Sequence, residues 1–361
     1  MTCGTRAEHV RGEWSSLGER APVWWDTRMS PAQNSPAHHS PVQISPVDPT
    51  DCEALIAWNA VLGEGFNAGR EAAWWASEET ILARFSDPKP QRLSVLLVAR
   101  RDGELVGAAG ADVDPADPAE VEISVLPAHR RQGIGTALAA AVRGALTGHA
   151  AVIQAETYSE EGVAFARAQG LRVANQEHRL LLDLPLDRAL LQAEARPAPG
   201  IEVRTWQGAC PEECLEDWAR LTTQMEADVP MGDLTRPASR ADVSEIRRNE
   251  QRMHAQGWTL VRGLAHDGGA AVGYTEIFVN RHDPEILTQD DTLVDRAHRG
   301  RGIGRALKLA NLENLAAVPE AKSSRWIQTY TALDNAPMLA LNRALGFREA
   351  DVLSILEGEL G

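Results

Sequence analysis

An internal duplication constrains this chain more than any other feature of its sequence. AHRRQGIGTAL at residues 128–138 returns as AHRGRGIGRAL at 297–307, with eight of eleven positions identical and an offset of 169 residues. An offset this long indicates repeated domains rather than a solenoid of short repeats. The 361 residues also exceed what one ordinary hydrophobic core uses, so each half can bury a core of its own.

The elements predicted around the repeat favour the same α+β fold in both halves. A turn at 101–103 separates two apolar runs, and HisAspGlyGly at 266–269 does the same in the second half, so each half contains a β-hairpin. Each hairpin precedes a strand, the duplicated turn, an apolar helix, a further strand and a short helix. We therefore expect two tandem domains, each a mixed, mostly antiparallel sheet flanked by helices.

Composition marks where the two domains begin and end. The leading residues repeat Ser-Pro pairs without apolar periodicity, which is typical of a disordered leader, and Met29 is an alternative start within it. RPAPG at 196–200 predicts a stiff linker, because proline cannot join regular strand pairing. The predicted organisation is a leader at 1–41, a first domain at 42–186, a helix and linker at 187–200 and a second domain at 201–361.

Bulk properties narrow the classes of function. The net charge of −15 argues against nucleic-acid partners, since phosphate-binding surfaces leave a basic excess. No apolar run approaches the roughly 18 residues of a membrane span, and no secretory signal is present, so we expect a cytoplasmic protein without a membrane partner. Cys210 and Cys214 lack the second ligand pair of a zinc site, so no metal is expected.

The duplicated turn has the properties of an anion-binding cradle. Its glycines let the backbone approach an oxyanion, and the unpaired N–H groups of the following helix point toward that ligand with the helix dipole behind them. Arg130 and Arg131, or Arg299 and Arg301, add charge suited to a diphosphate. A bare strand-to-helix turn with solvated arginines is the alternative, but two copies in one context favour a ligand site. Neither a dinucleotide-binding GxGxxG after a first strand nor a P-loop lysine is present.

The ArgXxxXxxGlyXxxGly spacing, late in the domain and after an antiparallel hairpin, resembles the pyrophosphate-binding motif of the GNAT superfamily of acyl-CoA transferases. The resemblance covers about residues 42–186 and 200–361. It implies acetyl-CoA as co-substrate, held by the amides of the turn between two strands that splay apart. The residues assigned to the cofactor are Leu293, Val294, Arg299, Gly300, Arg301, Gly302, Ile303, Gly304 and Asn335 in the second copy, and Val125, Arg130, Arg131, Gln132, Gly133, Ile134 and Gly135 in the first.

The second copy resembles the family more closely than the first. IQTYTALDN at 327–335 and MLALNRALGF at 338–347 are similar to the family's fifth strand and following helix. The resemblance implies that Asn335 lies beside the cofactor arm, and its position also suits a helix N-cap. The first copy has Ser159 in place of Asn335, so we expect catalysis in the second domain. A layout with one catalytic and one supporting copy is similar to that of the mycothiol synthase family.

Candidate catalytic residues follow from the resemblance and from the needs of proton transfer. Asp291 aligns with Glu122 and stands where many family members carry a general base, and Glu276 on the hairpin is the competing base. A structural carboxylate is the other interpretation of Asp291. The backbone N–H of Leu293 or Val294 would stabilise the oxyanion.

The proton donor for the leaving thiolate departs from the family pattern. The family's tyrosine, seven residues after the Asn, is replaced by Asn342 here and by Ala166 in the first copy. Tyr330, Tyr274 or solvent would then protonate the thiolate, although an ordinary buried aromatic is the alternative for Tyr330.

The sequence thus predicts an N-acetyltransferase that moves an acetyl group from acetyl-CoA to a small-molecule amine by direct attack, since no nucleophilic Cys or Ser motif is present. A predicted loop at 227–234, with Asp228 and Asp233, is a candidate for the acceptor pocket. The missing tyrosine leaves a second hypothesis, a non-catalytic acyl-CoA binding or sensing protein. We expect a monomer or a homodimer.

Overall fold

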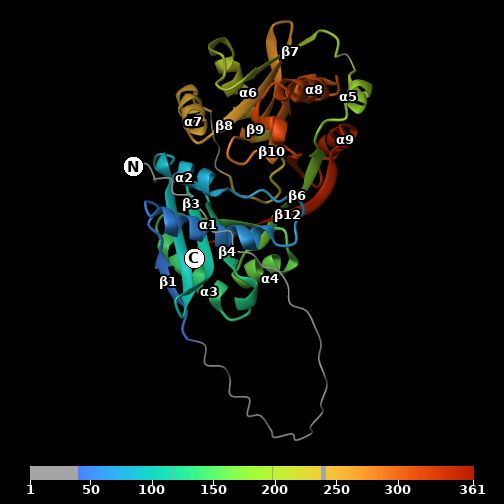
Figure 1. The fold of residues 1–361 in the computed structure, drawn as a ribbon. Coiled ribbons are helices and arrows are strands. Elements are labelled where there is room, and N and C mark those ends of the chain that lie inside the picture. Colours follow the sequence, from blue (N-terminus) through green and yellow to red (C-terminus); the bar gives the residue numbers. More distant parts are fainter. Residues whose placement is uncertain (1–39, 116, 197, 237–240) are drawn as a thin grey trace, which may run out of the picture. The chain divides into compact units, whose positions relative to one another are not determined.

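The structure, a computed structural model, describes residues 40–361 apart from 116, 197 and 237–240 (Figure 1). The predicted leader and the alternative start at Met29 lie outside the described residues, except for Ser40 and Pro41. Residues Val42–Gly361 form one compact unit. None of the helices in the described ranges is long and apolar enough to span a membrane.

The N-terminal half contains the predicted hairpin, formed by β2 and β3, and the predicted helix after the duplicated turn, α3. Three further elements, β1, α2 and β6, were not expected. The first two are short and carry little apolar periodicity, and β6 follows the last element that the sequence predicts for this half. The elements in chain order are β1 (Gln43–Pro46), α1 (Cys52–Asn67), α2 (Glu78–Ser86), β2 (Leu93–Arg101), β3 (Glu104–Val113), β4 (Ala119–Val125), α3 (Ile134–Leu146), β5 (Val152–Thr157), α4 (Glu160–Ala168) and β6 (Arg172–Asp183).

The C-terminal half repeats this order after a connecting helix, α5 (Arg188–Glu194). Its hairpin, β8 with β9, and its helix α8 lie where the sequence predicts them. The elements are β7 (Ile201–Gln207), α6 (Leu215–Asp228), α7 (Val243–Ala255), β8 (Trp258–Asp267), β9 (Ala270–Asn280), β10 (Ile286–Val294), α8 (Ile303–Leu315), β11 (Trp326–Ala332), α9 (Ala336–Ala344) and β12 (Arg348–Glu359).

The strands form one continuous sheet in which the two halves exchange their last strands. The order is β1-β2-β3-β4-β5-β12-β6-β11-β10-β9-β8-β7. In the first half β5 pairs with β12 from the second half, and in the second half β11 pairs with β6 from the first. The strands β6 and β12 also pair with each other. The α+β fold with two tandem copies is therefore confirmed, while each copy is completed by a strand from the other.

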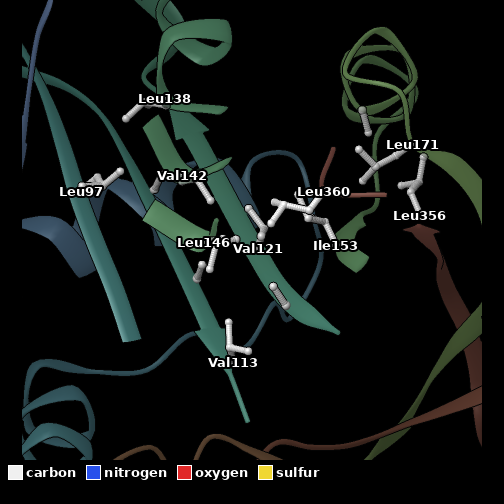
Figure 2. Close-up of a cluster of buried hydrophobic side chains, with 14 of the residues drawn as sticks. Leu97, Val113, Val121, Leu138, Val142, Leu146, Ile153, Leu171, Leu356 and Leu360 are labelled. Atoms are coloured by element: carbon white, nitrogen blue, oxygen red, sulfur yellow. The ribbon is translucent and has the colours of Figure 1, made fainter. Parts of the chain in front are cut away.

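The apolar cores follow the same exchange. Leu356 and Leu360 of the C-terminal strand region pack in the core beneath α3, together with Val121 and Leu171 of the first half (Figure 2). In the opposite direction, Leu180 and its neighbour Leu182 belong to the core of the second half. Separating the halves would expose these leucines, and each buried side chain contributes about 1.5–3 kcal/mol.

A buried ion-pair network reinforces the central strands. Arg179 on β6 is fully buried and donates to the Asp351 carboxylate on β12 at 2.8 Å, and to the carbonyls of Ala72 and Glu71. Arg70 donates to the same carboxylate at 3.1 Å. The partners of Arg179, on β12 and at residues 71 and 72, lie on segments that the strand exchange brings next to β6. The network therefore depends on the exchanged arrangement.

Candidate active site

The duplicated turn adopts the same backbone geometry in both copies. Gly133 and Gly302 are the N-cap residues of α3 and α8, each with a φ of 80°. The Nε of Arg130 and that of Arg299 each donate at 3.0 Å to the carbonyl five residues earlier. Arg131 holds a φ of 62° where the second copy has glycine. A left-handed non-glycine residue costs about 1–2 kcal/mol, so the first copy keeps the backbone turn of the cradle at an energetic cost.

The cradle of the C-terminal half has room for a ligand. At Gly300 and Gly302 nothing lies within 4 Å of the point where a Cβ would stand. No side chain caps the start of α8, so its first amides keep their hydrogen-bonding capacity for an anion. A diphosphate fits this set of donors, because close backbone approach and several unpaired N–H groups are what its oxygens require.

Carboxylates hold the cradle arginines at the rim. Arg299 donates to Asp228 at 2.6 Å, Arg296 pairs with the same carboxylate, and Arg301 pairs with Asp267. The three guanidinium groups all remain partly exposed. Their charge is therefore available at the cradle, although an incoming diphosphate competes with two carboxylates for it.

A cavity of about 640 Å³ extends from this cradle into the sheet. The strands β10 and β11 pair only between 286–288 and 326–328. Beyond that point the two strands no longer pair, and residues of both line the cavity, together with the cradle and the start of α9. The strands β10 and β11 thus separate beside the N-terminus of α8. An elongated ligand can enter there and reach from the anion cradle to the interior of the sheet.

Two adjacent carboxyl groups line this cavity at a bulge in β10. The register with β9 shifts between Gln289 and Thr292, so Asp290 and Asp291 both line the cavity rather than alternating between faces. The buried Gln289 amide donates to the Glu276 carbonyl at 2.7 Å and thereby ties the bulge to β9.

Enclosure in the cavity shifts the ionisation of this pair. Burial raises the pKa of Asp291, and the Tyr274 hydroxyl, which donates to it at 2.7 Å, partly opposes that rise. Burial and the neighbouring Asp291 charge raise the pKa of Asp290 well above its usual value. Carboxyl groups with raised pKa values suit proton exchange near neutral pH.

The other candidate base lies elsewhere. Glu276 is buried, pairs with Arg262, which also pairs with Glu250, and does not line the cavity. An ion pair this enclosed leaves the carboxylate committed to a structural partner. Of the two predicted bases, the structure brings only Asp291 to the cavity.

Two further predicted residues do line the cavity. Asn335 accepts from the Met338 amide at 3.3 Å, so the alternative of a helix N-cap is observed, and a contact with the cofactor arm stays a prediction. The Tyr330 hydroxyl shares a 2.9 Å hydrogen bond with the hydroxyl of Tyr158 from the N-terminal half, and burial raises the Tyr330 pKa. Leu293 and other predicted backbone donors on β10 also border the cavity.

The predicted acceptor loop is only partly at the site. Asp228, Val229 and Pro230 line the cavity. Asp233 instead forms an exposed ion pair with Arg172, so it points to another part of the surface.

The N-terminal half carries two smaller hollows on either side of β4 and β5, of about 110 and 370 Å³. They share the walls Ile123, Glu156 and Thr157. Glu122, which aligns with Asp291, lines the larger hollow, and its enclosure raises its pKa to about 7. The cradle residues 130–135 line neither of these hollows, whereas cradle residues of the second copy line the cavity of that half.

The remaining candidates have structural partners. Cys210 and Cys214 pack in an apolar cluster, and burial raises the Cys210 pKa to about 12. In the part of the chain that the structure describes, no three His, Cys, Asp or Glu side chains are placed to hold a metal ion.

The charged cavity residues missed from the sequence include Asp290 and Lys308. Lys308 on α8 lines the cavity with only 1 % of its surface exposed. A signal was present, because Ile303, Leu307 and Leu312 mark the apolar face of this helix and residue 308 falls within it.

Comparison with known proteins gives one match in each copy of the duplicated sequence. A profile of the acetyltransferase (GNAT) family matches residues 61–170 and 218–347, each range containing one cradle. The chain belongs to the GNAT acetyltransferase family. It is an acetyltransferase with two GNAT copies in tandem, as the resemblance of the cradle motif implied.

Relatives of similar length match most of this chain. A mycothiol acetyltransferase from Clavibacter michiganensis subsp. michiganensis is 30% identical over 287 residues, which cover 76% of this chain and 83% of the relative. Another from Salinispora arenicola is 31% identical over 274 residues, covering 75% and 83%. The solved structure of a tandem GNAT protein from the clavulanic acid biosynthesis pathway has 27% identity and a TM-score of 0.73, and covers 89% of this chain and 99% of its own.

Proposed function

We propose that the C-terminal half transfers an acetyl group from acetyl-CoA to the amine of a small-molecule acceptor. The observation that carries this proposal is the cavity that joins the open cradle at Gly302 to the carboxyl pair Asp290 and Asp291. In the N-terminal half the cradle residues line neither of the two hollows. The same contrast favours a supporting role for that half.

The cradle and the parted strands supply the binding of acetyl-CoA in this proposal. The amides after Gly300 and Gly302 hold the diphosphate, and Arg299 and Arg301 add charge at its edge. The pantetheine arm extends between β10 and β11, with the Leu293 or Val294 amide directed at the thioester oxygen. Backbone donors suit this task, because they are fixed before the oxyanion develops.

The carboxyl pair supplies acceptor recognition and proton removal. An alkylammonium group entering beside Asp290 and Asp291 finds the charge of the Asp291 carboxylate in a partly enclosed cavity, where charge attraction is stronger than in bulk water. Asp291 takes one proton from the amine, and the neutral nitrogen then attacks the thioester carbon. Tyr274 orients the Asp291 carboxyl through its 2.7 Å hydrogen bond.

A non-catalytic acyl-CoA binding or sensing role is retained as the second candidate, for the N-terminal half alone. It is favoured there by Ala166, which carries no proton donor at the family's tyrosine position. Family membership favours turnover for the chain as a whole.

Two assays test the proposal. Titration calorimetry with acetyl-CoA measures binding, and thiol release measured against a panel of amines, including the acceptor of the mycothiol acetyltransferases, measures turnover. We expect binding and amine-dependent thiol release. Binding without release on any amine would support sensing instead, and absence of binding would overturn both.

A further inference from the structure

Lys308 is a buried amine with no charge partner. It is one of only three lysines in the chain, and its residue is 1 % exposed. Within the described residues it forms no hydrogen bond or ion pair, and its one recorded contact is a cation–π approach, with Nζ 5.8 Å from the centre of the Phe347 ring. Its environment therefore does not compensate its charge.

Packing alone does not account for this residue. The first copy has Ala139 at the aligned position, also buried, and its α3 helix packs on the sheet in the same way as α8. A buried cation without a partner destabilises the fold, so such a group is found mainly where a ligand or a reaction uses it. The cavity is where that use would take place, since Lys308 lines it.

The position of Lys308 along α8 places it beyond the cradle, where it lines the cavity. It lies five residues after Ile303, or about 7.5 Å along the helix axis from the cradle. The helix contacts β9 and β10, and Lys308 lies on its face toward the parted strands. An acyl-CoA held at the cradle by its diphosphate would extend its thioester end into the same space.

The position of the family's tyrosine has no acid for a thiolate. Asn342, at the family's tyrosine position, is fully buried and donates through Nδ2 to the Thr331 hydroxyl at 3.2 Å. An amide does not give up a proton at neutral pH. The alternative donors are also committed, because the Tyr274 hydroxyl donates to Asp291 and the Tyr330 hydroxyl is shared with Tyr158.

We propose that the Lys308 ammonium donates the proton to the departing coenzyme A thiolate, in place of the family's tyrosine. This inference rests on the proposed function. The amine nitrogen forms its bond to the thioester carbon, the carbon–sulfur bond breaks with its electron pair on sulfur, and Nζ transfers one proton to that sulfur. Asp291 holds the proton that the ammonium loses before attack, and the second proton, which the nitrogen loses as the amide forms, passes to solvent. Exchange with solvent restores both side chains, so the products are the amide, the free thiol and one released proton.

The acidity of Lys308 fits this role. Burial lowers its pKa to about 7, below the roughly 8.5 of an ordinary cysteine thiol. Proton transfer from this ammonium to a thiolate is therefore downhill. A lysine of ordinary pKa in water would hold its proton too tightly for efficient transfer.

Other charged groups around the cavity are accounted for. The acidic ones are Glu177 on β6, Asp228 on α6 and the pair on β10, and the Asp228 carboxylate is already held by two arginines. The basic ones are His298 and Arg299 at the cradle and Arg305 on α8, and Arg305 pairs with Glu194. These charged groups are unchanged in the variants described below, so differences in activity among those variants arise from residue 308.

The test compares Lys308→Met, Lys308→Arg and Lys308→Ala with Lys322→Met, the same change at an exposed lysine outside the cavity. We expect Lys308→Met to lower kcat by about 10²–10⁴-fold while acetyl-CoA affinity, measured by calorimetry, stays within a few-fold. Lys308→Arg keeps the charge without a transferable proton, so it should not restore kcat. Lys308→Ala reproduces the first copy and gives the same readout if the methionine variant folds poorly.

A second readout does not depend on turnover. Ultraviolet absorbance follows ionisation of the thiol of bound coenzyme A, and loss of the cation should raise that thiol's pKa by about one to three units, with Lys308→Arg retaining the lower value. Unchanged kcat and unchanged thiol ionisation in both neutral variants would overturn the inference. If wild-type protein neither binds acetyl-CoA nor releases thiol, the proposed function fails instead, so the two failures are distinguishable.

Discussion

Valine at Gly302 tests the cradle, and valine at Gly133 is its matched control. Both glycines are N-cap residues with a φ of 80°, and nothing lies within 4 Å of the point where a Cβ would stand in either. The backbone penalty of a left-handed non-glycine residue, about 1–2 kcal/mol, should therefore be similar at the two sites. Both variants should lose a few degrees in Tm.

The effect on the ligand should differ between the two sites. A hydrogen bond to a charged group contributes about 1.5–3 kcal/mol, and 1.4 kcal/mol corresponds to a tenfold change in affinity. Loss of one amide-to-diphosphate bond at Gly302 should then weaken acetyl-CoA binding roughly 10- to 150-fold. The Gly133 variant should keep full thiol release, because the cradle residues of that half line neither of its hollows.

Calorimetry gives the affinity and stoichiometry of acetyl-CoA, thiol release gives turnover, and thermal unfolding verifies that both variants remain folded. Equal affinity and turnover in the two variants, at matched stability, would refute the assignment of catalysis to the C-terminal half. A larger loss for Gly133→Val would reverse it.

Four other predictions concern residues of the site and of the central ion-pair network. Asp291→Asn should lower kcat about 10²–10⁴-fold with little change in acetyl-CoA affinity. Tyr274→Phe removes a hydrogen bond that lowers the Asp291 pKa, so it should move the acidic limb of the rate–pH profile to higher pH. Because folding lowers the Lys308 pKa from 10.5 to about 7, the unfolded chain binds more protons between these values, so wild-type stability should rise with pH across that window; denaturant unfolding of Lys308→Met should lack this slope, worth about 1.4 kcal/mol per pKa unit. Asp351→Ala, which leaves the Arg179 charge buried without its carboxylate, should cost about 3–5 kcal/mol in chemical denaturation, and a loss under 1 kcal/mol would contradict the role of this pair.

Local features of the fold were predictable because their signals are local. The hairpins were marked by turn residues between apolar runs, and the helices α3 and α8 by glycines followed by an apolar periodicity. The turn of the cradle was predictable for the same reason, since glycine at 302 permits the positive φ that the turn requires. The short strand β1 and helix α2 were missed because four and nine residues carry too little pattern to separate from loops.

The strand exchange was not predictable in this way. A β-strand pattern specifies which side chains face a core, and it does not specify which of two homologous cores receives them. The apolar residues of β6 and β12 satisfy either partner locally, and the choice is made by long-range packing of Leu180 and Leu356.

The carboxyl pair and the lysine show two further limits. Asp290 was missed because strand alternation places it on the face opposite Asp291, and only the bulge brings both to the cavity. Lys308 was missed because a lysine on a helix is expected at the surface, although its apolar neighbours at positions 303, 307 and 312 pointed inward. In both cases the functional position violates the local rule, which is where a sequence pattern carries the least information.

The exchange of strands also explains how a chain can keep two copies when its cavities differ. Glu177 on β6, a strand of the first half, lines the cavity of the second, while Asp351 on β12 lines the larger hollow of the first. The hydroxyls of Tyr158 and Tyr330 connect the two sites at 2.9 Å. The N-terminal half therefore supplies part of the wall of the C-terminal cavity and the strand that completes its sheet. Loss of chemistry in the first copy would leave these structural contributions intact, whereas loss of its fold would remove them, so selection on the second site alone is enough to maintain both copies.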